Sequence, residues 1–298
     1  MIRKMILGVL ALGIFATSCS NDDDGSTPSP ATSTLTIDFT GLAPLGDNYV
    51  YEGWIIVDGA PVSTGVLTSL TFPQTIQIAT EQLAAATKFV LSIEPESDTD
   101  PAPAATKILA GDFSGNSANV LPAPVTTDAS NFLSSTGKFF LRTPTDEAAG
   151  SGNNMNDEYG IWFGTPGAPP TAGLDLPTLS AGWKYEGWVV VEGVGPISTG
   201  TFTGFAEVDD SNNFSGTENN AGPPIPGEDF FLNAPAGFTF PLDVRGRDVV
   251  ISIEPDPDNS TDPFSMKPLA GTAGNDTAPT TYDLALNLVS LPSGTVSR

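Results

Sequence analysis

The residues that could do chemistry in this sequence are few, and most of them are carboxylates. The 298 residues contain no histidine and a single cysteine. A histidine-based catalytic triad is therefore excluded, as are zinc sites built on histidine or cysteine. The glycine-rich phosphate-binding patterns GxGxxG and GxxxxGK[ST] do not occur. Paired carboxylates, of the kind that glycosidases use, are the remaining candidates for catalysis.

Two pairs of glutamates could supply such chemistry. Glu52 and Glu186 lie in twin Tyr-Glu-Gly-Trp motifs, and Glu94 and Glu254 lie in twin Ser-Ile-Glu-Pro motifs. Because each glutamate recurs once per copy, a catalytic site would have to exist twice. Repeats usually keep framework residues, whereas functional sites are added to a fold separately. We therefore expect Glu94 and Glu254 to accept backbone hydrogen bonds at strand ends, and we predict no enzymatic activity.

An acidic loop after the second Ser-Ile-Glu-Pro motif is a candidate metal site. Asp256, Asp258 and Asp262 place carboxylates close together in the sequence. Calcium binds six to eight oxygen ligands and suits such loops. The central glycine and terminal glutamate of an EF-hand are missing. We consider these three residues as ligands for calcium; the alternative is an ordinary acidic loop exposed to solvent.

Two tryptophans are candidates for binding a ligand. Trp162 lies in the segment YGIWFG, and Trp183 lies just before the second Tyr-Glu-Gly-Trp motif. Exposed aromatic rings beside Asn and Asp could form a platform for a sugar. The alternative for both residues is packing in the hydrophobic core.

The N-terminus has the layout of a secretory signal. Arg3 and Lys4 precede an apolar run over residues 5–15, and small residues stand directly before Cys19. The run is shorter than the roughly 20 residues that span a bilayer. A lone cysteine in an exported chain calls for an explanation, and lipidation supplies one. We expect residues 1–18 to be a lipoprotein signal peptide and Cys19 to anchor the chain to a membrane.

A tether follows the anchor. Residues 19–34 are polar, acidic or small, which is typical of a flexible linker. The acidic run Asp22–Asp24 resembles the surface-export signal of Bacteroidota-type lipoproteins. The alternative is a solvated tail. We expect an outer-membrane anchor that displays the chain on the cell surface, or otherwise faces the periplasm.

Composition limits the class of protein and its partners. A formal net charge of −24 repels nucleic acid, so we predict no nucleic-acid partner. The 31 glycines and 27 prolines, with only 15% charged residues, favour short strands joined by turns. Helical periodicity is confined to residues 80–87, where Thr80 could cap a short helix. The chain is therefore predicted to be all-β.

An internal repeat organises the chain. YEGWIIVDGAPVSTG at residues 51–65 corresponds to YEGWVVVEGVGPISTG at residues 185–200. Farther along, FVLSIEP at 89–95 corresponds to VVISIEP at 249–255. Each copy alternates short apolar runs with turn residues, which predicts antiparallel strands.

We expect two related antiparallel β-sandwich-like domains in tandem. The first covers residues 35–145, and the second covers residues 146–298. The longer second copy places an inserted loop at about residues 209–229. Additional strands are predicted at residues 138–142 and 159–163.

The order of these motifs resembles the extracytoplasmic domain of anti-sigma-K-type factors. The shared elements are a Tyr-x-x-Trp strand, a Ser-Thr-Gly hairpin exit and an Ile-Glu-Pro block, over about residues 49–111 and 183–271. The resemblance implies a β-sandwich sensor-like fold. It does not imply sigma regulation, because the sequence suggests neither a sigma-binding helical segment nor a transmembrane helix. We expect an interaction or structural module with an unknown protein or glycan ligand; a carbohydrate-binding surface lipoprotein is the alternative.

Overall fold

The computed structural model describes residues 30–258 and 260–298. The expected signal peptide, Cys19 and the run Asp22–Asp24 lie outside the described residues. Residues 32–298 group together as one unit. Within the part of the chain described, no helix is long and apolar enough to cross a membrane.

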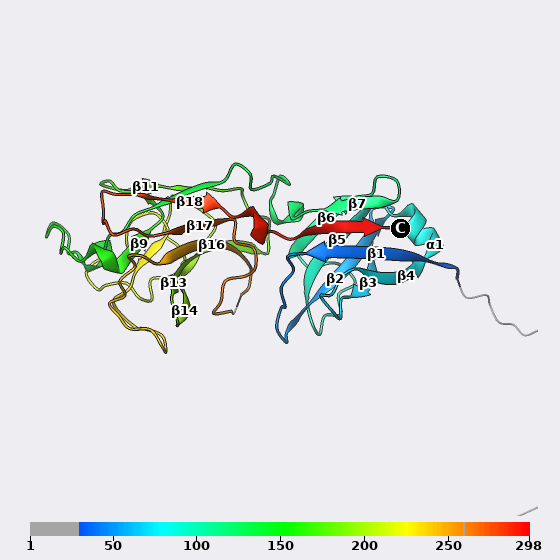
Figure 1. Cartoon of the computed structure of the whole chain (residues 1–298), viewed down its shortest axis with the longest axis horizontal. Helices are drawn as coiled ribbons and strands as arrows, with labels where there is room; N and C mark the ends of the chain where they lie inside the picture. Colours follow the sequence, from blue (N-terminus) through cyan, green and yellow to red (C-terminus); the bar gives the residue numbers. More distant parts are fainter. Residues whose placement is uncertain (1–29, 259) are drawn as a thin grey trace, which may run out of the picture. The chain divides into compact units, whose positions relative to one another are not determined.

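The fold is all-β and antiparallel, as the sequence predicts (Figure 1). Two four-stranded sheets come mainly from the first third of the chain. One has the order β4(Gln74–Ala79)-β1(Thr32–Thr40)-β19(Ser293–Ser297)-β7(Ser117–Val120). The other has the order β3(Ala60–Val66)-β2(Tyr49–Val57)-β5(Lys88–Pro95)-β6(Lys107–Asp112).

A seven-stranded sheet contains the second set of repeated motifs. Its order is β12(Leu174–Asp175)-β8(Thr136–Phe139)-β18(Tyr282–Leu286)-β17(Leu269–Thr272)-β16(Asp248–Pro255)-β13(Trp183–Val191)-β14(Gly195–Phe202). Two small pairs accompany it, β10(Gly164–Thr165) with β11(Thr171–Ala172) and β9(Gly160–Trp162) with β15(Gly227–Asp229). The strand expected at 159–163 forms as β9, whereas the one expected at 138–142 overlaps β8 only at residues 138–139, after which Phe140 makes an isolated bridge to Trp162.

Helical structure is short in the described residues. The α-helix α1 covers Thr80–Ala85, where the sequence predicted it. The expected cap was wrong: Ala79 is the N-cap residue, and the Thr80 hydroxyl is 2.9 Å from the hydroxyl of Ser33. The 3-10 turns are η1(Ala123–Val125), η2(Pro144–Asp146), η3(Asp157–Tyr159) and η4(Leu288–Ser290).

The repeated motifs occupy the same positions in their sheets. In β2, Tyr51 pairs with Ile93 of β5; in β13, Tyr185 pairs with Ile253 of β16. Each of these strands then bulges directly after the glycine of its Tyr-Glu-Gly-Trp motif, where it meets the neighbouring hairpin strand. The two copies thus share register as well as sequence.

The glycine at each bulge is required by close packing. A Cβ atom at Gly53 would collide with the Thr64 hydroxyl, and one at Gly187 would collide with the Thr199 hydroxyl and the ring of Phe163. Alternating residues of the strands fill an apolar core between sheets, for example where Phe39 of β1 meets Phe89 of β5 at 5.9 Å between ring centroids. Both rings are buried.

Two strands pair across the boundary expected at residue 145. Strand β8 pairs with β18 and β12 in the seven-stranded sheet. The C-terminal strand β19 lies between β1 and β7, and Figure 1 shows this red strand beside the blue start of the described chain. The division into residues 35–145 and 146–298 stays a prediction. Strand β8 of the first range pairs with strands of the second, and β19 of the second range pairs with strands of the first.

Candidate functional site

A chain of hydrogen bonds links Trp188, Ser252 and Glu254 in the second copy. The indole nitrogen of Trp188 donates to Ser252 Oγ at 2.7 Å, and the Ser252 hydroxyl donates to Glu254 Oε1. The backbone N–H of Phe264 also donates to the Glu254 carboxylate, at 3.0 and 3.1 Å. Glu254 is only 1% exposed. It therefore ties the end of β16 to the loop that follows.

The first copy contains the same chain. Trp54 Nε1 donates to Ser92 Oγ at 2.8 Å, Ser92 donates to Glu94 Oε1, and the N–H of Ala104 donates to the same oxygen at 2.8 Å. Glu94 Oε2 is buried and has no hydrogen-bond partner among the described residues. The expectation that Glu94 and Glu254 accept backbone hydrogen bonds at strand ends is confirmed.

The other pair of glutamates is also held by serines. Ser63 donates to Glu52, and Ser198 donates to Glu186. Each serine Oγ in turn accepts a backbone N–H at 3.0 Å from the glycine two residues later. Glu186 is buried, whereas Glu52 is half-buried.

Three carboxylates converge in the second copy. Glu186, Glu254 and Asp258 each offer one oxygen, and these oxygens all lie within 4.8 Å of one another. We call these residues the acidic triad. Of the three residues predicted to bind calcium, the structure brings Asp258 into the triad. Asp256 lies 3.9 Å from Lys184 Nζ, and the Asp262 N–H donates to Ser260 at 3.0 Å.

Burial makes the triad a poor place for unbalanced negative charge. It raises the pKa of Glu186 to about 7, with the charge of Asp258 adding to the effect. Burial also raises the pKa of Glu254 to about 7, helped by the charges of Glu186 and Asp258. Nearby Lys267 donates to the carbonyl of Phe264 at 2.7 Å, not to the carboxylates. The triad therefore favours a proton or a bound cation.

Among the described residues, the triad has no spare ligands for calcium beyond its own carboxylates. Calcium takes six to eight oxygen ligands, and the residues brought together here are three carboxylates. Hydrogen-bond donors already occupy part of the Glu186 and Glu254 carboxylates. Calcium binding by the loop of Asp256, Asp258 and Asp262 stays a prediction.

The two candidate sugar-binding tryptophans are buried. Trp162 is 2% exposed and Trp183 is 3% exposed. The Trp162 indole donates to Asp229 at 2.8 Å, and Trp183 packs near Phe264 at 6.2 Å between ring centroids. A stacking platform needs an exposed ring face, and neither residue provides one. Both rings therefore lie in the interior of the protein.

A cavity of about 710 Å³ lies beside the triad. Its walls come from the loop at residues 43–49, the end of β5 and the segment 104–106, facing residues 254–265. Glu254 and Asp258 of the triad line it. Its volume lies within the range of roughly 300–1,000 Å³ typical of small-molecule sites. The acidic loop after β16 could be predicted from the sequence. Nothing in the sequence indicates that the loop at residues 43–49 lies opposite it.

More buried carboxyl groups lie in the region predicted as an inserted loop. Burial raises the pKa of Asp209 and of Asp229 to about 7 and that of Glu228 to about 8. Asp229 accepts the N–H of Thr145 at 2.8 Å in addition to the Trp162 indole. Asp229 fastens the insertion to the body of the protein, which sequence reasoning missed because Thr145 and Trp162 are distant in the chain. Asp209 and Glu228 instead accept hydrogen bonds from residues within the insertion itself.

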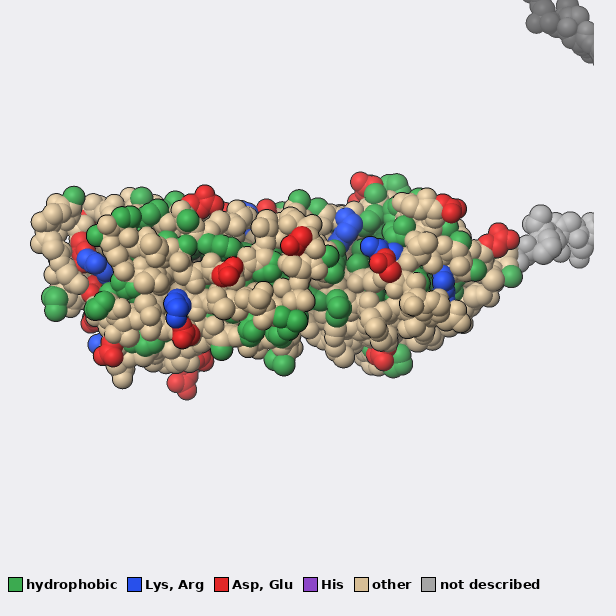
Figure 2. Space-filling view, turned by 90° about the horizontal axis from the view of Figure 1, so that it is seen from above, with side chains coloured by type: hydrophobic (Ala, Val, Ile, Leu, Met, Phe, Trp, Pro, Cys, Tyr) green, Lys and Arg blue, Asp and Glu red, His purple; other side chains and the backbone are tan. Residues whose placement is uncertain are grey.

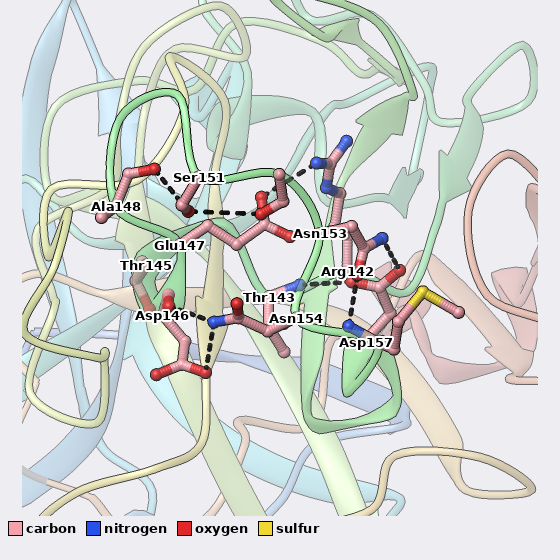
Figure 3. A network of polar contacts seen from close by, with 12 residues as sticks. Arg142, Thr143, Thr145, Asp146, Glu147, Ala148, Ser151, Asn153, Asn154 and Asp157 are labelled. Carbon is pink, nitrogen blue, oxygen red and sulfur yellow. Dashed lines mark hydrogen bonds and ion pairs between the residues drawn. The ribbon is translucent and has the colours of Figure 1, made fainter.

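The polar loop after β8 was also not predicted from the sequence. In Figure 3, Asn154 points to Asp146, Asn153 to Asp157 and Arg142 to Glu147. The corresponding distances are 3.1, 2.7 and 2.9 Å. These amides and carboxylates bind one another, which is the arrangement of a structural loop. A run rich in Asn and Asp was the signal available in the sequence.

Comparison with known proteins bears on the first copy. The family model described as Anti-sigma-K factor rskA, C-terminal, matches residues 26–108. The match agrees with the resemblance expected for the first copy, and it ends before the second copy begins. Comparison with curated proteins and with solved structures finds no match. Residues 26–108 thus contain a module similar to the C-terminal domain of anti-sigma-K factors.

Proposed function

We propose that this chain is a lipid-anchored cell-envelope protein that carries a non-enzymatic interaction or structural module of anti-sigma-factor type, present in two copies. The observation that carries the proposal is the family match over residues 26–108, together with the Trp–Ser–Glu hydrogen-bond chain that recurs in the second copy. The matched segment supplies the class of module. The recurring contacts extend that class to the second copy.

A non-enzymatic role is supported by the way the carboxylates are held. Glu94 and Glu254 each accept a serine hydroxyl and a backbone N–H, so both are integral to the framework of their sheets. A carbohydrate-binding role would need side chains other than Trp162 and Trp183, because both are buried.

The surface also supports a partner other than nucleic acid. Figure 2 shows acidic and basic side chains interspersed on one face, with hydrophobic side chains in small groups among them. Nucleic-acid binding needs a clustered basic patch, and the chain has 11 basic against 35 acidic residues.

Anchoring through Cys19 can be tested by fractionation. We expect the wild-type chain, expressed in a bacterium with a lipoprotein pathway, to be cleaved before Cys19, to sediment with membranes and to be extracted by detergent. Cys19→Ser removes the thiol that would be acylated, so the variant should either keep its signal segment or appear in the soluble fraction. Ser20→Ala changes the next hydroxyl and serves as the matched control. A Cys19→Ser chain that is cleaved to the wild-type size and still sediments with membranes would refute the anchor.

Display on the cell surface needs a separate test. We expect protease added to intact cells to degrade the wild-type chain while a periplasmic marker survives. Replacing Asp22, Asp23 and Asp24 with Asn should protect the chain, because the acidic run is the proposed export signal. Equal degradation of both forms would remove that role from the run, and protection of the wild-type chain would place it in the periplasm.

A further inference from the structure

The two copies of the repeat contain equivalent strands whose outer edges differ. Strand β3 in the first copy corresponds to β14 in the second, with Gly65 matching Gly200 and Val66 matching Thr201. Both strands stand at the end of their sheets, β3 beside β2 and β14 beside β13 (Figure 1). An edge strand exposes backbone N–H and C=O groups that can pair with another segment. The two edges can therefore be compared position by position.

In the second copy, the insertion covers this edge. The N–H of Asp210 donates to the carbonyl of Thr201 at 2.9 Å. The Asp210 carboxylate accepts the Thr201 hydroxyl at 3.0 Å and Lys184 Nζ at 2.7 Å. A Cβ atom on Gly200 would lie 2.7 Å from Asp209 Cγ. Asp209 and Asp210 thus lie directly against β14.

In the first copy, the same edge is open. A Cβ atom on Gly65 would have no neighbour within 4 Å in the described part of the chain, apart from the adjoining residues. Val66 is 47% exposed, and the backbone groups of residues 60–66 form no hydrogen bond to any described segment outside the hairpin of β2 and β3. Residues 67–73 lead directly to β4, so the first copy has no insertion of its own at this edge.

The side chains around the open edge are apolar where those of the covered edge are polar. Val50 stands in the place of Lys184, and Val66 stands in the place of Thr201. Lys184 and Thr201 hold the carboxylate of the insertion, whereas two valines offer a carboxylate no hydrogen-bond donor. A segment that fits the open edge is therefore extended, like the insertion, but brings an apolar side chain to the position that Asp210 occupies in the second copy.

We propose that β3 is a docking site for an extended segment of a partner protein, which adds a strand to the sheet and places an apolar side chain against Val50 and Val66. Main-chain hydrogen bonds supply the affinity and the two valines supply the specificity, as in other cases of β-strand addition. Pro61 has no N–H, so the added strand pairs with the part of β3 from Val62 onward. The proposal rests on the interaction module proposed above and names its class of partner.

Two synthetic peptides test the site. One is AEVDDSNN, the insertion sequence of residues 206–213, and the other is AEVDVSNN, which replaces Asp210 with valine. We expect the valine peptide, added to the chain from residue 20 to 298, to shift the NMR amide signals of Val62–Val66 saturably. The aspartate peptide should bind roughly tenfold more weakly, because its carboxylate would lose water without gaining a donor.

A double variant exchanges the polarity of the edge. Val50→Lys combined with Val66→Thr gives β3 the side chains of the second copy, so this variant should prefer the aspartate peptide. Val289→Lys changes a valine that is 93% exposed and lies in η4, and it should keep the wild-type preference. Circular dichroism melts verify that both variants are folded.

Several results would overturn the docking site. These are equal affinity of the wild type for the two peptides, no shift at β3 with either peptide, and an unchanged preference in the folded double variant. Self-association of the wild type in sedimentation that the double variant abolishes would instead assign the edge to a second copy of this chain.

Failure of the docking site is distinguishable from failure of the anchored module, because none of these results changes the outcome of the Cys19 fractionation. If the double variant is unfolded, the comparison of the two peptides on the wild type still decides the proposal.

Discussion

Replacing Glu254 with glutamine should flatten the dependence of stability on pH. Glu254 has its pKa raised from 4.5 to about 7 by burial, so the folded state keeps a proton that the unfolded state releases. Between about pH 4.5 and pH 7 the folded state therefore binds more protons, and the free energy of unfolding falls as pH rises. Glutamine keeps an oxygen that can accept from Ser252 and Phe264, but it carries no charge at any pH.

The size of the effect follows from the shift. A shift from 4.5 to about 7 corresponds to ~3 kcal/mol lost between pH 4.5 and pH 7. The local slope for one such group approaches ~1.4 kcal/mol per pH unit. Glu186, with its pKa also near 7, contributes in the same direction. The wild type should therefore be clearly more stable at pH 5 than at pH 8, and Glu254→Gln should lose less over that range.

Urea unfolding followed by tryptophan fluorescence at pH 5, 6, 7 and 8 measures this. Glu96→Gln, which removes an exposed carboxyl after β5, is the control and should follow the wild-type slope. A wild-type stability that rises from pH 5 to pH 8 would show that burial does not raise the pKa of Glu254 in the folded chain. So would a Glu254→Gln slope equal to that of the wild type.

Three further variants probe the framework. Gly187→Ala would force a methyl group into the Thr199 hydroxyl, so we expect a loss of about 1–3 kcal/mol in urea unfolding; a loss below ~0.5 kcal/mol would contradict the packing at the bulge. Trp188→Phe leaves Ser252 without its indole donor, and we expect a loss of about 1–3 kcal/mol, whereas an unchanged midpoint would argue against the hydrogen-bond chain. Arg298→Ala removes guanidinium bonds of 2.6 and 2.7 Å to carbonyls around the end of α1, and the thermal midpoint should fall; an equal midpoint would show that these bonds contribute nothing.

Local patterns in the sequence were enough to predict the repeat and the strands that carry its motifs. Alternation around Trp54 and Trp188, the glycines at the bulges and the prolines that end β5 and β16 all act over a few residues. The hydrogen-bonding role of Glu94 could be predicted for the same reason, because it stands at a strand end before a turn. Burial of Trp162 and Trp183 was only an alternative, since their partners come from distant segments.

The arrangement of distant segments could not be predicted from the sequence. No local signal places β19 between β1 and β7, because any short apolar run with exposed backbone groups could fill that position. The acidic triad joins Glu186 to residues about 70 positions later through the pairing of β13 with β16. The cavity depends on a loop of the first copy facing a loop of the second, so it appears only when the chain is folded.

Mass spectrometry of the N-terminal peptide, from the chain purified out of detergent-extracted membranes, tests whether the protein is anchored through Cys19. We expect the mature chain to begin at Cys19 and this residue to carry a diacylglyceryl group, so the peptide is heavier than its sequence by the mass of the lipid. A peptide that begins at Met1, or an unmodified Cys19 in the mature chain, would contradict the anchored module.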